Sequence, residues 1–148
     1  MSAQGQQKRF DAWKLAALHA TIGGSVDPAS LARLEDRVAG KEGEITWSIT
    51  GTSDSQGRAA VDVSIEGRVP LICQRCLGEL VQEVSQSTLL LLARDESEVV
   101  RLDESSEDEV LLADAPLDPL ALVEDEMLLT LPFAPRHEER CTAKLEVA

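Results

Sequence analysis

The sequence predicts an α+β fold in which N-terminal helices and one C-terminal helix pack on an antiparallel β-meander. Apolar and polar residues alternate at residues 45–50 and again at 61–66, which is the pattern of half-buried strands. A third apolar run covers residues 80–93, and an apolar segment with helix boundary signals covers 118–131. Short turns join the three expected strands, and such strands pair antiparallel.

The first expected helices precede the sheet. Apolar residues recur at a short helical spacing over residues 10–20, and a glycine pair beginning at Gly23 interrupts the pattern. A second helix is expected over residues 27–40, because Asp27 can cap its start and Gly40 follows its end. Both helices should cover part of the sheet.

The helix expected over residues 118–131 has the clearest signals. Asp118 can cap it, a proline suits its first turn, and Pro132 ends it. The acidic residues should mark its solvent side. The side chains expected to face the sheet are Leu120, Val123, Met127, Leu128 and Leu131, and those expected to face water are Glu124, Asp125 and Glu126.

Polar segments complete a single domain over residues 1–148. Residues 1–7 should be loose, and residues 132–148 should form an irregular tail. Residues 95–109 contain eight acids and one arginine, which predicts a mobile, solvated loop. The alternative is that this acidic stretch is a finger that binds a basic partner.

The formal net charge of −13 repels phosphate backbones and favours basic protein partners. No apolar run approaches the roughly 18 residues that span a bilayer, and the first residues lack the apolar stretch of a secretory signal. We therefore expect a soluble, cytoplasmic protein without a membrane partner.

Four residues predict a zinc site. Cys73 and Cys76 form a C-x2-C pair after a strand, and His137 and Cys141 form an H-x3-C pair in the tail. Thiolates and an imidazole on two short loops can hold one tetrahedral ion. Two other interpretations stay open: reduced cysteines with a surface histidine, or a thiol redox pair, which is the weaker because no helix follows the cysteines to stabilise a thiolate.

Motifs of other catalytic sites are absent from the sequence. It contains no glycine-rich phosphate loop, no G-x-S-x-G and no H-E-x-x-H. Its carboxylates lie in charge runs or on the expected wet face of a helix, where we expect them to titrate normally. We therefore expect no enzyme and no small-molecule substrate.

Two segments carry a resemblance to a known family. VPLICQRCLGEL, and then LDPLALVEDEMLLTLPFAPRHEERC after an acidic stretch, resemble the YceD proteins of bacteria and plastids, which are named for large ribosomal RNA subunit accumulation. The resemblance implies a role in making or retaining large-subunit ribosomal RNA, and it carries over no catalytic residue. The residues that match the family pattern are Cys73, Arg75, Cys76, Leu77, Glu124, Asp125, Glu126, Pro132, His137 and Cys141.

A partner surface is expected where the two cysteine segments converge. There Arg68, Arg75, Arg136 and Arg140 would gather at one end of the sheet, opposite the acidic segment. We expect a non-enzymatic factor that supports ribosomal RNA accumulation or ribosome assembly by contacting ribosomal RNA or ribosomal proteins. Two alternatives stay open: unconnected surface arginines, and a zinc-stabilised protein-interaction module without RNA contact.

Overall fold

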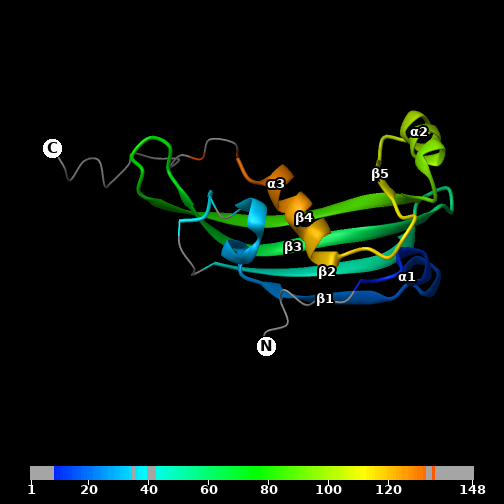
Figure 1. Cartoon of the computed structure of the whole chain (residues 1–148), viewed down its shortest axis with the longest axis horizontal. Helices are drawn as coiled ribbons and strands as arrows, with labels where there is room; N and C mark the ends of the chain where they lie inside the picture. The colour runs from blue at the N-terminus through cyan, green and yellow to red at the C-terminus, as the bar shows by residue number, and fades with distance from the viewer. Residues whose placement is uncertain (1–8, 35, 40–42, 133–134, 136–148) are drawn as a thin grey trace.

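A single five-stranded sheet organises the chain in the computed structural model, which describes residues 9–34, 36–39, 43–132 and 135. One face of the sheet carries α3 and the short helical turns, while α1 and α2 lie at one end (Figure 1). The elements in chain order are α1 (Ala12–Leu18), β1 (Thr21–Val26), η2 (Pro28–Ser30), η3 (Ala32–Leu34), β2 (Glu44–Ser53), β3 (Ala59–Ile72), β4 (Glu79–Ala93), α2 (Glu96–Ser105), β5 (Glu109–Leu112) and α3 (Pro119–Thr130).

The predicted α+β class is confirmed, but the sheet is mixed instead of purely antiparallel. Its strand order is β1-β2-β3-β4-β5, and the first four strands form an antiparallel meander. The last strand pairs with β4 in parallel, from Leu90 opposite Glu109 to Ala93 opposite Leu112. The chain leaves β4, passes through α2 and returns, and this crossover makes β5 run in the same direction as β4.

The first strand lies where the sequence predicts only a break between helices. Thr21 pairs with Thr50 and Val26 with Ile45, so the glycine pair lies in the middle of β1. A Cβ atom on Gly23 would lie 2.8 Å from the Trp47 carbonyl oxygen, which is closer than a side chain allows. Gly23 therefore permits close packing inside a strand and does not end an element.

The prediction of a helix over residues 27–40 is wrong beyond the first turns of this segment. Asp27 caps η2 by accepting the Ala29 N–H at 2.9 Å, but the chain then continues only as η3. Leu31 and Leu34 are buried in the core, and Val38 forms a bridge with Leu71 of β3. Contacts with the sheet therefore override the helical periodicity of this segment.

The first helix is shorter than predicted and lies against strand backbone. Asp11 caps it, and His19 ends it in the left-handed conformation at φ 51°. A Cβ atom on Gly51 of β2 would lie 1.9 Å from the Leu15 carbonyl oxygen, so only glycine permits this approach. The Trp13 indole N–H donates to the Ala113 carbonyl at 2.9 Å and ties the helix to the segment that precedes α3.

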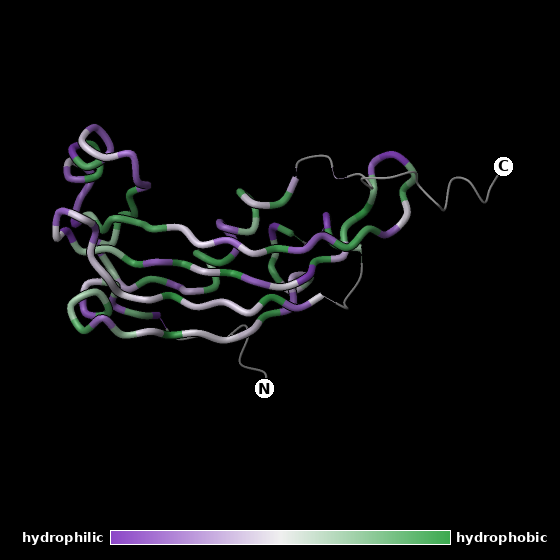
Figure 2. The backbone as a smooth tube through the Cα atoms, turned by 180° about the vertical axis from the view of Figure 1, so that it is seen from behind, coloured by the Kyte–Doolittle hydropathy of each residue, from purple (hydrophilic) through white to green (hydrophobic). Residues whose placement is uncertain are grey.

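The core forms on the sheet face that α3 covers. Along β3 every second residue from Val61 to Cys73 is buried, apart from the half-buried Gly67, which confirms the alternation in the sequence. Towards its end β4 is buried on both faces, where its run of leucines lies. Seen from the other side, apolar stretches are concentrated at that end and near the hairpin of β3 and β4 (Figure 2).

Most of the acidic stretch 95–109, predicted as a loop, is the helix α2. The Asp95 carboxylate caps it by accepting the Glu98 N–H at 2.8 Å, and none of its residues is buried. Local capping thus stabilises a surface helix, which the acidic composition alone did not predict.

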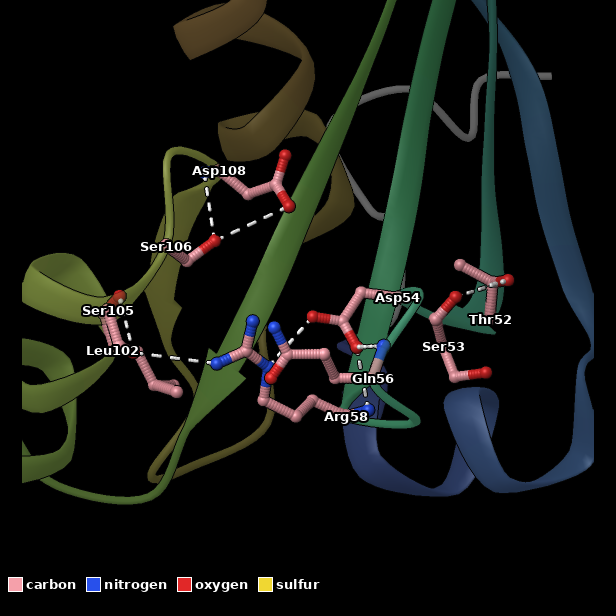
Figure 3. A network of polar contacts seen from close by, with 9 residues as sticks. All are labelled: Thr52, Ser53, Asp54, Gln56, Arg58, Leu102, Ser105, Ser106 and Asp108. Carbon is pink, nitrogen blue, oxygen red and sulfur yellow. Dashed lines mark hydrogen bonds and ion pairs between the residues drawn. The ribbon is translucent and has the colours of Figure 1, made fainter.

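A polar network joins the end of α2 to the β2–β3 turn (Figure 3). Within the turn, Asp54 accepts hydrogen bonds from the backbone N–H groups of Gln56 and Arg58 and from the Arg58 side chain. Arg58 also donates to the Ser105 hydroxyl at 3.5 Å. Burial raises the pKa of Asp54, but the hydrogen bonds from Arg58 outweigh it and the net pKa is lowered.

Candidate functional site

The predicted cysteine loop is confirmed as the turn between β3 and β4. Cys73 is buried and follows directly after Ile72, the last residue of β3. The Cys73 N–H donates to the Gly78 carbonyl and the Leu77 N–H donates to the Cys73 carbonyl, each at 2.8 Å. These two backbone hydrogen bonds close the turn and fix the backbone positions of both cysteines.

The turn also directs a backbone donor at sulfur. The Gly78 N–H donates to Cys76 Sγ at 3.4 Å, and Leu77 adopts the left-handed conformation at φ 63°. A leucine in this conformation costs free energy, and only its surroundings maintain it.

The chain that follows α3 runs back to this loop. The Arg37 side chain donates to the Pro132 carbonyl at 2.6 Å, and the Gln74 N–H donates to the Pro135 carbonyl at 2.7 Å. Pro135 is buried. The start of the tail therefore contacts Gln74, one of the two residues between the cysteines, as convergence of the two segments requires.

The second half of each predicted site lies outside the described residues. This holds for the zinc ligands His137 and Cys141 and for Arg136 and Arg140. Within residues 9–34, 36–39, 43–132 and 135, no three His, Cys, Asp or Glu side chains are grouped as metal ligands. The zinc hypothesis and the RNA contact therefore stay predictions.

Arg68 and Arg75 lie near the cysteine-loop end of the sheet, and both are exposed. Arg68 pairs with Glu83 at 3.6 Å, and Glu44 is its partner on β2. The expected positive end is therefore partly neutralised. The acidic helix α2 lies at the opposite end of the sheet, as the sequence predicts (Figure 1).

The prediction that all three acidic residues of α3 face water is wrong for Glu126. Asp125 is exposed, but Glu126 is 4% exposed and its carboxylate accepts the Thr88 hydroxyl of β4 at 2.8 Å. Glu126 follows Val123 by three residues and precedes Met127, so it falls on the helix face that those apolar side chains define. That spacing was visible in the sequence. Burial raises the pKa of Glu126.

Arg33 binds the other two acids. Its Nη2 lies 2.5 Å from Asp125, its Nε lies 3.2 Å from Glu124, and its backbone N–H donates to Glu124 at 2.7 Å. Hydrogen bonds to Asp125 and Glu124 raise the pKa of the guanidinium. Arg33 and Thr88 are the partners that sequence reasoning missed, because no local pattern relates them to a helix so far away in the chain.

The described helices are too short and insufficiently apolar for any of them to cross a membrane.

Comparison with known proteins identifies the family. Residues 61–147, more than half of the chain, match the family described as large ribosomal RNA subunit accumulation protein YceD. The match begins in β3 and includes the cysteine loop, α3 and the tail. No solved structure matches the chain. The chain belongs to the YceD family, whose name indicates a role in the accumulation of large-subunit ribosomal RNA.

Proposed function

We propose that this protein supports the accumulation of large-subunit ribosomal RNA as a non-enzymatic factor that acts by binding, at the end of the sheet that carries the cysteine loop. The proposal rests on one observation: the family match includes this loop and the start of the tail, which contacts the loop at Gln74. Exposed Arg75 lies inside the loop and Arg68 lies nearby on β3. Exposed guanidinium groups suit phosphate contacts, which position a protein on RNA.

The test is complementation in cells that lack the protein. The ratio of large-subunit to small-subunit ribosomal RNA should fall when the gene is removed and should recover with the unchanged protein. Arg68→Ala with Arg75→Ala should fail to restore it. Arg101→Ala removes an exposed arginine at the opposite end of the sheet and should restore it fully. Full restoration by the double variant would exclude the two arginines as the contact.

Purification from cell lysate with and without nuclease distinguishes RNA from protein partners. Ribosomal RNA that is retained in a salt-dependent way indicates contact with phosphates. Ribosomal proteins that remain bound after nuclease treatment indicate a protein contact. Recovery of neither would contradict the proposed association.

A second candidate is a zinc-stabilised interaction module, and the bond between Gln74 and Pro135 favours it. That bond holds the start of the tail at the C-x2-C turn, and in the sequence His137 follows Pro135 by two residues. We propose that Cys73, Cys76, His137 and Cys141 hold one zinc ion. A structural zinc can contribute more than about 10 kcal/mol of apparent binding free energy, which is large compared with the packing of a short tail.

Elemental analysis of protein purified without a histidine tag tests the zinc proposal. About one zinc per chain is expected, because the four ligands form a single tetrahedral set, and Cys73→Ser should lose it. Protein that contains no metal, and whose melting temperature is unchanged by chelator, would refute the proposal.

A further inference from the structure

A groove lies between α3 and the edge strand β5, away from the cysteine loop. Its volume is about 370 Å³, and its apolar lining includes Leu90, Leu111, Leu122 and Leu129. An adjoining hollow of about 400 Å³ extends it towards Thr88. The two hollows share Leu129, Glu109 and Glu126, so they form one continuous surface, the α3–β5 groove.

Leu129 gives this groove an apolar side chain in contact with water. It is 68% exposed, although the helix that carries it is otherwise closely packed at Val123 and Met127. Removing exposed apolar surface from water is favourable, and such surface beside a groove is typical of binding sites. An apolar group from a partner would cover Leu129 at little cost in rearrangement.

The charges in the groove are unbalanced. It is lined by the carboxylates of Glu109, Asp125 and Glu126 and by one guanidinium, that of Arg33, which is already paired with Asp125.

Among the carboxylates of the groove, that of Glu126 would be stabilised most by an incoming cation. Its carboxylate is 4% exposed, and the donor it is seen to accept from, the Thr88 hydroxyl, is neutral. Burial raises its pKa, the hydrogen bond from Thr88 lowers it in part, and the nearby charges of Glu109 and Asp125 raise it further. A buried carboxylate is costly without a cation, so a lysine or arginine placed beside it would gain free energy.

We propose that the α3–β5 groove binds a protein segment in which cationic and apolar side chains alternate, with a Lys or Arg beside Glu126 and an apolar side chain against Leu129. Charge complementarity selects this occupant, because the carboxylates that line the groove repel the phosphates of RNA. The groove is separate from the arginines near the cysteine loop, so it can bind a protein whether or not that end contacts RNA.

The test uses the full chain and a short fluorescent peptide in which Lys and Leu alternate. Fluorescence anisotropy should give a Kd that rises at least about tenfold in Leu129→Gln and in Glu126→Gln, because each removes one of the two principal contacts. Glu104→Gln is the matched control, since it removes an exposed carboxylate from α2 by the same chemistry. Its Kd should equal that of the unchanged protein.

Two comparisons separate the groove from general attraction between a basic peptide and an acidic protein. A peptide in which Lys and Ser alternate should bind more weakly, because it cannot cover Leu129. Equal binding of the two peptides, or equal Kd values for all the variants, would overturn the proposal. Direct binding of a fluorescent single-stranded RNA to the protein, weakened in Leu129→Gln, would also overturn it, because the groove would then accept phosphates. Circular dichroism of each variant confirms that it is folded.

Discussion

Helices α2 and α3 share a type of cap and an acidic character, but they differ in their surroundings. Each follows an aspartate cap, Asp95 or Asp118, and each contains several acids. No residue of α2 is buried, whereas Val123 and Met127 of α3 are completely buried and even the acidic Glu126 is covered. Acid content therefore does not decide whether a helix is part of the core. The apolar face that a helix offers to the sheet decides it.

The largest expected effect on stability is for a substitution in α3, the helix that contributes to the core. Met127→Ala should lower the free energy of unfolding by about 2–5 kcal/mol, because it leaves a cavity in a packed core. Val100→Ala on α2 is the control and should change it by less than about 0.5 kcal/mol, since Val100 is 55% exposed. Urea denaturation measures both. Similar losses in the two variants would mean that α2 also contributes to the core.

Asp54→Ala should have the next largest effect, on the turn that the polar network joins to α2. It leaves the Gln56 and Arg58 N–H groups and the Arg58 side chain without this acceptor, which should cost about 1–3 kcal/mol. Asp54 has a lowered pKa in the folded protein, so its contribution is complete above the unfolded value and is lost as pH falls through the folded value. Urea titrations at several acidic pH values should show the difference between variant and unchanged protein shrinking. A constant difference would contradict this.

Glu126→Gln should have a smaller effect and the opposite sign. Burial raises the pKa of Glu126 in the folded protein, so ionisation opposes folding as pH rises from the unfolded value through the folded value. The amide keeps an oxygen that can accept the Thr88 hydroxyl but carries no charge. The variant should therefore be more stable than the unchanged protein at neutral pH, and the gain should disappear in acid. Melting temperatures between pH 4 and pH 7 provide the measurement, and a loss of stability at neutral pH would contradict the account.

The smallest effect is expected at Asp125. Asp125 and Arg33 are both about half exposed, so their ion pair is screened by solvent. Asp125→Ala should cost no more than about 1 kcal/mol. Glu104→Gln on α2 should be close to neutral in the same urea titration. If Asp125→Ala costs several kcal/mol, the contacts of Arg33 with α3 stabilise the fold much more than an exposed pair does.

Local patterns were sufficient to predict the three central strands, the C-terminal helix and the cysteine loop. Alternation identified β2 and β3, and the cap and proline signals identified α3 to within a residue at each end. These patterns succeed because period and capping depend on neighbouring residues. At the candidate site, local sequence likewise identified Cys73 and Cys76 as residues of one tight turn.

The remaining features depend on contacts between segments that are far apart in the chain. The sequence by itself determined the meander, the α3 boundaries and the acidic character of the protein. Only the tertiary structure decided that β1 pairs along β2, that β5 is parallel to β4, and that Arg33 binds α3. It also decided that Thr88 reaches Glu126. The physical reason is that pairing, burial and charge compensation depend on which surfaces meet, and local propensity does not contain that information.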